Sequence, residues 1–445
     1  MVDEKELLAK ASQPAKEAMR LHPFYRGKIK IIAKCCVRNF DDFAVWYTPG
    51  VAAPCKAIYE DKSLVYKYTN KWNTVAVISD GTRVLGLGDI GPEAALPVME
   101  GKALLFKYLG GVDAFPLCLD TKDPEEFIHT VKLLQPAFGG VNLEDIAQPK
   151  CFEILRRLRE ECEIPVWHDD QQGTAAVTLA GLINSLKIVG KKIEEVKIAM
   201  VGAGAANISI ARLIIAYGAN PENIIMCDSK GALHKKRKEL KNTHKEKWEI
   251  CQKTNVEGRT GYIPEVMEGM DVLIALSKPG PGVVKKEWVA RMARNPIVFA
   301  CANPIPEIWP WEAKEVGARV VATGRSDFPN QVNNSLGFPG IFRGTLDVQA
   351  ETITDEMCIA AAKELAKCAE ERGLDEEYII PTMEEWDVYP REAVAVGMEA
   401  IAQGKARIKL TREELYRKAS DTIRIAREET KFLMKEGFIP LPPEK

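Results

Sequence analysis

The sequence predicts an α/β protein of two domains, the second with a doubly wound sheet, followed by a helical C-terminal segment. From about residue 72, short apolar β-type runs alternate with amphipathic helical runs, the pattern of a largely parallel sheet. The chain has 445 residues, more than one core usually supports. We therefore expect a first domain at 1–171, a second at 172–345, and a helical segment at 346–445 that packs on the first domain or at an interface.

Composition argues against several classes of partner. The chain has 61 Lys and Arg against 63 Asp and Glu, so its net charge of -2 gives no general attraction to nucleic acid or to an anionic membrane. The 11 cysteines show no Cys-x-x-Cys pair and no zinc spacing. The N-terminus is charged from residue 3 and has apolar residues at helical spacing, so we expect a helix there and neither a signal peptide nor a membrane anchor. A cytoplasmic protein with reduced thiols is the simplest interpretation.

The predicted elements of the first domain follow one another in regular alternation. Strands are expected at 74–79 and 113–119, and helices at 98–110 and 124–135. The unit at 138–168 is the most informative. FGGVNL reads as a short buried strand that stops at Glu144-Asp145, CFEILRRLREEC has one apolar helical face, and IPVWH reads as a second strand that stops at Asp169-Asp170.

These two strand ends predict a cation site. Consecutive strands joined by a crossover helix are usually parallel neighbours, so their carboxyl ends lie roughly 5 Å apart. Four carboxylates, those of Glu144, Asp145, Asp169 and Asp170, would then converge, and all-oxygen ligands suit Mg²⁺ or Mn²⁺. Any single one of these side chains would by default be a solvated charge at a strand end. His168 should face away from Asp169 and pack, because side chains alternate along a strand.

A long helix starting at QQGTAAV leads into the second domain. Strands are expected at 196–201, 223–228, 271–277, 296–303 and 318–324, and a helix at 209–218. The strands end in loops of Gly, Pro, Asn or Asp, the order of a doubly wound domain that binds ligands beyond its strand ends. After residue 350 the chain reads as helical, and Thr411-x-x-Glu414 forms a capping-box pattern. The polar stretch at 231–256 fits a solvated loop or helix better than a nucleic-acid arm.

A glycine-rich turn after the first strand of this domain predicts a Rossmann-like NAD(P)-binding domain. The turn and the start of its helix comprise Gly202, Ala203, Gly204, Ala205, Ala206 and Asn207. Glycines let the backbone approach a pyrophosphate, which the helix N-terminus stabilises. Asn207 stands where a third Gly or Ala is usual, so helix and strand are expected to lie slightly apart. Without a ligand, the same pattern would be only a tight strand–helix turn.

The next strand end bears on the choice of coenzyme. Asp228 ends that strand, where a carboxylate can accept hydrogen bonds from a ribose diol, which favours NAD. Ser229 and Lys230 follow directly, and a lysine at this point could instead meet the 2'-phosphate of NADP. NAD versus NADP therefore stays open, with a slight lean to NAD.

Three further side chains are candidate catalytic or substrate-binding residues only if they lie in a cleft beside the predicted cation site. Lys102 interrupts an apolar helical face and would by default extend its charge to the surface. Beside a cation, burial and the positive charge would both lower its pKa and make it a base near neutral pH. Tyr47, by default a half-buried aromatic, could transfer a proton in the same cleft. Arg83, by default a turn cap, suits a substrate carboxylate.

Seven motifs stand out along the chain. They are YTPGVAAP at 47–54, SDGTRVLGLGDIGPEAALPVMEGKALLF at 79–106, FGGVNLEDIAQPKCF at 138–152, HDDQQGTA at 168–175, GAGAAN at 202–207, ANPIPE at 302–307 and TGRSDFPNQVNNSLGFPGIFRG at 323–344. Together they closely resemble the malic enzymes, in their short prokaryotic form. The resemblance covers roughly residues 40–350.

The resemblance implies a role for each site residue. Tyr47 matches the family's general acid, Lys102 its general base, and Asp169 a neighbouring carboxylate that helps position lysine and metal. The metal ligands match Glu144, Asp145 and Asp170. Arg83 matches an arginine that holds a substrate carboxylate in the larger enzymes of the family. Asn303, Asn333 and Asn334 match residues that contact the substrate or the nicotinamide end, and either of the adjacent pair could face inward.

The implied activity is oxidative decarboxylation of L-malate to pyruvate and CO2, with NAD or NADP and with Mg²⁺ or Mn²⁺. Decarboxylation of oxaloacetate is a further expected reaction, and at least a homodimer is expected. Two alternatives remain open at this point. A metal-independent amino-acid dehydrogenase would also pair a lysine-bearing domain with a dinucleotide domain, but it leaves the four carboxylates unexplained. A catalytically silent nucleotide sensor would bind coenzyme without turning over malate.

Overall fold

The computed structural model describes residues 4–444 and contains two sheets within them. The first has the order β2-β1-β3-β4 and is parallel throughout. Its strands are β1 (Thr74–Ser79), β2 (Asp113–Cys118), β3 (Gly140–Leu143) and β4 (Val166–His168). The second has the order β10-β9-β8-β5-β6-β7, antiparallel only between β6 and β7. Its strands are β5 (Ile198–Val201), β6 (Ile224–Asp228), β7 (Gly231–Ala232), β8 (Val272–Ala275), β9 (Ile297–Ala300) and β10 (Val320–Thr323).

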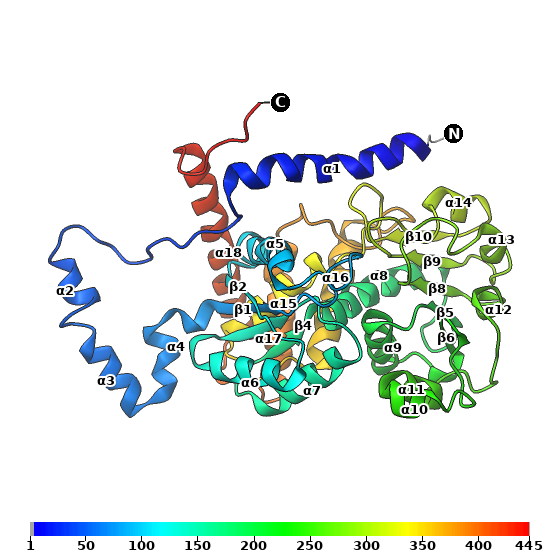
Figure 1. Ribbon diagram of the computed structural model, residues 1–445, viewed down its shortest axis with the longest axis horizontal. Helices are drawn as coiled ribbons and strands as arrows, with labels where there is room; N and C mark the ends of the chain where they lie inside the picture. The colour runs from blue at the N-terminus through cyan, green and yellow to red at the C-terminus, as the bar shows by residue number, and fades with distance from the viewer. Residues whose placement is uncertain (1–3, 445) are drawn as a thin grey trace.

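The α/β class and the doubly wound second sheet are confirmed (Figure 1). The predicted pairing of the two informative strands is also present, because β3 and β4 are parallel neighbours with Leu143 opposite His168. Every residue of β3 and β4 is buried, as expected for strands that carry helices on the faces of a parallel sheet. The two strand ends therefore open at one edge of the sheet.

Helices of the first domain cover this sheet. They are α5 (Pro92–Gly110), α6 (Pro124–Leu134) and α7 (Lys150–Glu161), while the short helix α4 (Val65–Tyr68) precedes β1 in the chain. The helix expected from residue 98 begins six residues earlier, because Pro92 occupies the first turn, where no amide N–H is needed. It ends at Gly111, whose φ of 63° gives the left-handed cap. α5 carries Lys102 on its buried face.

A mostly buried helix joins the two sheets. α8 (Thr174–Val189) follows a π-helical turn (Asp169–Gly173) and packs against α9 (Ala205–Tyr217) and α16 (Asp355–Arg372). The remaining helices of this region are α10 (Leu240–Thr243), α11 (Lys245–Lys253), α12 (Ile263–Met267), α13 (Lys286–Val289) and α14 (Pro310–Glu315). α8 thus continues directly from the turn at Asp169–Gly173, called the cation-site turn below, into the core of the second domain.

Four helices follow the second sheet, as the sequence predicted for the end of the chain. They are α15 (Phe338–Asp347), α16, α17 (Val388–Ala402) and α18 (Arg412–Lys435). α17 packs on α15, and α18 packs on α17 and on α5 of the first domain. The expected capping box is present, with Thr411 and Glu414 each accepting the other's backbone N–H. None of the described helices is both long and apolar enough to cross a membrane.

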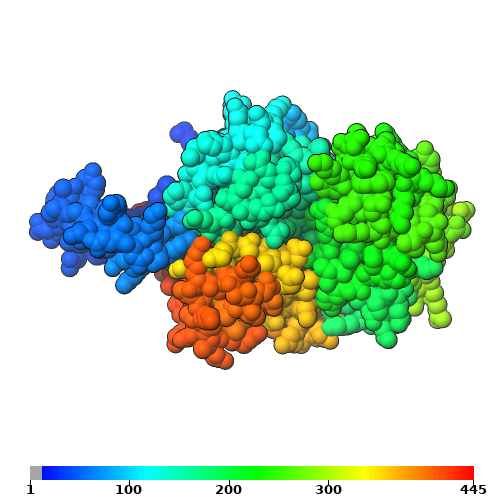
Figure 2. Space-filling model, turned by 90° about the horizontal axis from the view of Figure 1, so that it is seen from below, coloured from blue at the N-terminus to red at the C-terminus, as the bar shows by residue number. Residues whose placement is uncertain are grey.

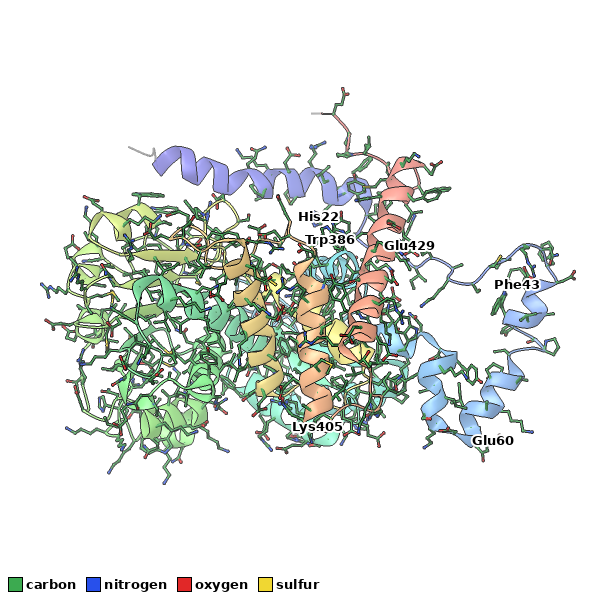
Figure 3. The ribbon with its side chains drawn as sticks, turned by 180° about the vertical axis from the view of Figure 1, so that it is seen from behind. His22, Phe43, Glu60, Trp386, Lys405 and Glu429 are labelled. Atoms are coloured by element: carbon green, nitrogen blue, oxygen red, sulfur yellow. The ribbon has the colours of Figure 1, made fainter. Side chains whose placement is uncertain are left out.

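The expected N-terminal helix is present as α1 (Glu4–Tyr25), and residues 27–61 form an arm that the sequence did not predict. α1 lies along one side of the body, and α2 (Asp42–Trp46) and α3 (Ala52–Glu60) project away from it (Figures 1 and 2). Phe43 on α2 and Glu60 at the end of α3 lie far out on this arm in Figure 3. The arm exposes large apolar side chains, namely Ile31, Ile32, Val37, Phe40, Phe43, Val45, Trp46, Tyr47, Val51 and Tyr59. All eleven cysteines are free.

One acidic side chain is buried in the helical core away from the strand ends. Glu392 of α17 is fully buried, and neither of its carboxyl oxygens has a hydrogen-bond partner. It packs on Gly340 of α15, where an added Cβ would lie 2.0 Å from Glu392 Oε2. Burial first, and then the charge of Glu364, raise the pKa of Glu392 well above its ordinary value.

Replacing Glu392 by Gln should stabilise the protein, and more so at pH 8 than at pH 5. An unfolded glutamate ionises above about pH 4.3, whereas the raised pKa of the folded one delays its ionisation to higher pH, so the wild type loses up to about 1.4 kcal/mol per pH unit between the two pKa values. The glutamine does not titrate and has almost the same shape. Denaturant unfolding at both pH values measures the effect, and a gap between variant and wild type that does not widen with pH would contradict it.

Candidate active site

Three carboxylates meet at the ends of β3 and β4. Glu144 and Asp145 follow β3 and Asp170 lies two residues beyond β4, and one oxygen from each lies within 4.8 Å of the other two. The backbone N–H of Asp145 donates to Asp170 Oδ2 at 2.9 Å, which ties the two strand ends together. The parallel pairing predicted from the sequence thus brings together three of the four expected side chains.

The fourth carboxylate contacts Lys102 instead. Lys102 Nζ lies 2.5 Å from Asp169 Oδ2 and 3.1 Å from Glu144 Oε1. The ammonium group also lies 4.4 Å from the centre of the Phe338 ring. Only 8% of the lysine side chain and none of the Asp169 side chain is exposed. Lys102 therefore does not extend to the surface, as a lysine on an apolar helical face would by default.

The carboxylates around Lys102 hold its pKa above the ordinary value, and the lowering expected beside a bound cation stays a prediction. Burial lowers it, as the sequence analysis assumed, but the charges of Asp169 and Glu144 and the hydrogen bond to Asp169 outweigh burial and raise it above its ordinary value. The side chain is held as an ammonium ion by its carboxylate neighbours. The sequence pattern could not reveal that two of the four carboxylates would contact Nζ directly.

The carboxylate cluster has the chemistry of a divalent cation site. Burial and the charge of Asp170 raise the pKa of Asp145 to about 7, and burial raises the pKa of Glu144 well above its usual range. Asp145 Oδ2 is buried with no hydrogen-bond partner. Crowded oxygen donors with an unpaired buried atom fit Mg²⁺ or Mn²⁺, whose charge offsets the repulsion. His168 is buried, as expected, with Nδ1 3.7 Å from Asp170 Oδ2 rather than turned towards Asp169.

Arg83 and Asn303 lie where the two domains approach each other. The backbone N–H of Arg83 donates to Asp145 O at 3.0 Å, and the Arg83 charge is one of the factors that lower the pKa of Asp145. Gly86, in the same loop, faces the second domain, because an added Cβ there would lie 3.5 Å from Asn303 O. Arg83 and Asn303 are both exposed and therefore accessible to a small molecule.

The two adjacent asparagines differ in their use. Asn333 Oδ1 accepts the backbone N–H of Ser335 at 3.0 Å and so caps a short helical turn. Asn334 lies beside the cation-site turn, since a Cβ on Gly173 would be 3.4 Å from Asn334 Cβ and 2.0 Å from Asp169 Oδ1. Asn334 is thus the member of the pair nearer to Lys102 and its carboxylates.

Tyr47 does not lie in this cleft. It follows α2 on the projecting arm and is 72% exposed, so the body of its own chain does not cover it. One chain therefore does not bring Tyr47 beside its own Lys102, and the proton transfer expected of Tyr47 stays a prediction. The reason is the arm itself, because residues 27–61 extend away from the sheet instead of folding back over it (Figure 1).

The glycine-rich turn has the shape expected of a phosphate-binding turn. Gly202 has a φ of 100°, and a Cβ there would lie 2.3 Å from Leu276 O, so only glycine fits. Gly204 faces open space at the start of α9, and Ala203, Ala205 and Ala206 keep the turn free of bulk. Asn207 is fully buried and donates to Val201 O at 3.0 Å and Gly202 O at 2.8 Å. It therefore bridges helix and strand by hydrogen bonds.

Asp228 forms ion pairs with two basic side chains that the sequence did not indicate. Its carboxylate lies 2.7 Å from Arg237 Nη1 and 3.3 Å from Lys247 Nζ, and it accepts the N–H of Lys230 at 2.9 Å. Burial raises its pKa, but these partners outweigh burial and hold the pKa below its ordinary value. Arg237 and Lys247 both belong to the polar stretch at 231–256, so part of that stretch is buried against the strand end rather than solvated.

A doubly wound sheet with a glycine-rich turn, facing a lysine and an acidic cluster, defines a dinucleotide-dependent oxidoreductase with a cation site. The comparisons with known proteins identify the family. Residues 26–159 match the family "Malic enzyme, N-terminal domain" and residues 171–402 match "Malic enzyme, NAD binding domain". The chain belongs to the malic enzyme family, whose members oxidatively decarboxylate malate with NAD or NADP. The amino-acid dehydrogenase alternative is thereby set aside.

Individual malic enzymes are similar to this chain over most of their own length. The chain is 52% identical to a bifunctional malic/malolactic enzyme of Bacillus subtilis, over 90% of this chain and 97% of that protein. It is 54% identical to an NAD-dependent malic enzyme of Geobacillus stearothermophilus, over 86% and 78% respectively. The crystal structure of Entamoeba histolytica malic enzyme superposes with a TM-score of 0.97 at 50% identity, covering 100% of this chain and 93% of that one.

The close approach at Gly173 gives a direct test of the site. Gly173→Ala would place a Cβ against Asp169 Oδ1 and displace the carboxylate that holds Lys102. Malate turnover should fall by at least about tenfold, since small displacements of catalytic groups cost this much. Gly101→Ala is the matched control, because a Cβ there meets nothing within 4 Å although it adjoins Lys102. Equal turnover in the two variants would contradict this account of Gly173.

Proposed function

We propose that Lys102 takes the hydroxyl proton of L-malate, that Glu144, Asp145 and Asp170 hold the divalent cation, and that Asp169 positions Lys102. The observation that carries this assignment is Lys102 Nζ held between Asp169 and Glu144, with Glu144 also part of the cluster. One carboxylate thus adjoins both the proposed base and the proposed cation. Arg83, exposed at the domain boundary, would bind and orient a substrate carboxylate, and Asn334 would complete that side of the site. Asn303 would contact the nicotinamide end of a coenzyme whose pyrophosphate binds at the Gly202–Gly204 turn.

When bound, the coenzyme accepts the hydride, and the cation acts as a Lewis acid on the substrate oxygens and offsets the carboxylate charge that keeps the pKa of Lys102 high. The chain's own residues move the protons. Lys102 Nζ is within hydrogen-bond reach of Asp169, which can steady the ammonium ion after it has taken the hydroxyl proton. After CO2 has left, carbon C3 needs a proton, and Tyr47 is proposed to supply it.

Tyr47 can supply that proton only from a second copy of the chain. The arm that carries it exposes Phe40, Phe43, Val45 and Trp46, an apolar surface that a monomer would leave in water. We infer a homodimer in which each arm covers the other subunit and places Tyr47 beside the other subunit's Lys102. An isologous pair of this kind makes two equivalent shared sites.

For the coenzyme, we keep the lean to NAD. Asp228 stays ionised at its strand end and can accept a hydrogen bond from a ribose hydroxyl. The guanidinium of Arg237 is already committed to Asp228 and Glu239, which leaves it little capacity for a 2'-phosphate. We also propose that the domains divide at 171/172 and 345/346, and that the eleven free thiols reflect a reducing cytoplasm.

The activity test is absorbance at 340 nm with L-malate and Mn²⁺, run in parallel with NAD and NADP. Reduction should require the cation, stop with EDTA and produce matching pyruvate, and it should be faster with NAD. Lactate is assayed in the same samples, because a relative carries a malolactic activity in its name. Coenzyme binding without any reduction would favour the nucleotide-sensor alternative and remove the proposed roles.

Shared sites predict complementation between an inactive and an impaired variant. Lys102→Ala should abolish malate oxidation and Tyr47→Phe should slow turnover, but co-expression should restore about a quarter of wild-type activity, since half of the randomly mixed dimers contain one intact site.

Lys102→Ala mixed with Asp170→Asn is the matched control, because both lesions lie in the body of the chain and no mixed dimer has an intact site. Recovery in the control, or none in the test pair, would contradict the shared site.

A further inference from the structure

A buried carboxylate connects two loops of the second domain. Glu307 is fully buried in the segment that follows β9. Its Oε1 accepts the backbone N–H of Ser277 at 2.8 Å and the Ser277 hydroxyl at 3.2 Å, and its Oε2 accepts the backbone N–H of Ala302 at 3.1 Å. Ser277 lies two residues beyond β8 and Ala302 two residues beyond β9. One carboxylate therefore binds the carboxyl ends of two neighbouring strands.

Backbone hydrogen bonds join the same two loops. Gly280 N donates to Ile305 O and Val284 N donates to Glu307 O, each at 3.1 Å. Within residues 4–444 no ion pair to Glu307 is recorded, so backbone and hydroxyl donors alone satisfy the buried carboxylate. A carboxylate offers acceptors on both sides, whereas an amide offers one acceptor and one donor. Glutamine at this position would direct an N–H at one of the two backbone N–H groups.

The two loops contact different parts of the proposed site. Leu276, next to Ser277, packs its carbonyl oxygen against Gly202 of the phosphate-binding turn. Asn303, next to Ala302, packs its side chain over Gly324 and its carbonyl oxygen near Gly86 of the first domain. The Glu307 carboxylate thus fixes the distance between the turn proposed for the pyrophosphate and the asparagine proposed for the nicotinamide end.

We propose that Glu307 is a positioning residue for hydride transfer, which sets the nicotinamide against the substrate by holding the Ser277 and Ala302 loops at a fixed spacing. This inference rests on the proposed function, which assigns Gly202–Gly204 to the coenzyme and Asn303 to the nicotinamide end. Glu307 itself touches neither substrate nor coenzyme in this account.

The test compares two reactions of one protein. Malate oxidation needs hydride transfer, whereas cation-dependent decarboxylation of oxaloacetate does not. Glu307→Gln should lower kcat for malate oxidation by about tenfold or more and raise the dissociation constant of the reduced coenzyme, followed by its fluorescence. Oxaloacetate decarboxylation should stay within about twofold of wild type, as it needs the cation cluster and a proton donor but no hydride transfer. Glu315→Gln, an exposed glutamate of α14, is the matched control and should change neither reaction.

Glu307→Asp serves as the second variant if Glu307→Gln does not fold. Its shorter side chain keeps both acceptors but can reach only one loop, so the same split between the two reactions is expected. Equal losses in both reactions, or unchanged kcat and coenzyme affinity, would overturn the proposal. Coenzyme affinity distinguishes this outcome from failure of the proposed function. If the wild type binds the reduced coenzyme but does not turn over malate, the proposed function fails. The affinity of Glu307→Gln for the coenzyme then still shows whether Glu307 controls that binding.

Discussion

The site depends on the ammonium group of Lys102 held between Asp169 and Glu144. Four carboxylates close together and largely buried would repel one another, and the lysine alone would be costly to bury. Together they compensate: the ammonium lies 2.5 Å from Asp169 Oδ2 and 3.1 Å from Glu144 Oε1. The three partners come from α5, the end of β3 and the turn after β4. One ion-pair network therefore fixes the relative positions of three elements of the first domain, and it leaves Asp145 and Asp170 free to face a cation.

The same network reaches the second domain through the π-helical turn at Asp169–Gly173. This turn continues into α8, whose buried length packs on α9, the helix that begins at the glycine-rich turn. A displacement of Asp169 would thus shift the start of α8, and a displacement of the dinucleotide sheet would shift the position of Lys102. Glu307 has a comparable role on the opposite side, where it joins the loops after β8 and β9. In the arrangement we propose, these two connections would set the distance between coenzyme and substrate.

Sequence patterns predicted the position of the carboxylate cluster because strand-forming runs and the acidic residues after them can be recognised locally. Buried runs that end in paired acids fixed the ends of β3 and β4, and the crossover rule placed them side by side. The same reasoning could not determine which carboxylate would contact Lys102, because that depends on side-chain packing between α5 and the turn. It did not find Arg237 and Lys247 as partners of Asp228, since they lie 9 and 19 residues further on in a stretch that reads as solvated. It could not place Tyr47 either, because no local pattern in the sequence indicates the direction in which residues 27–61 extend.

The central claim is that Glu144, Asp145 and Asp170 form a single cation site, and Mn²⁺ binding followed by electron paramagnetic resonance tests it most directly. The account predicts one tight site per chain in the wild type. Asp145→Asn should weaken that site by at least about tenfold, because a neutral amide replaces an anionic ligand. Asp120→Asn, which removes an exposed carboxylate outside the cluster, should leave it unchanged. Equal Mn²⁺ affinity in the wild type and in Asp145→Asn would contradict the account.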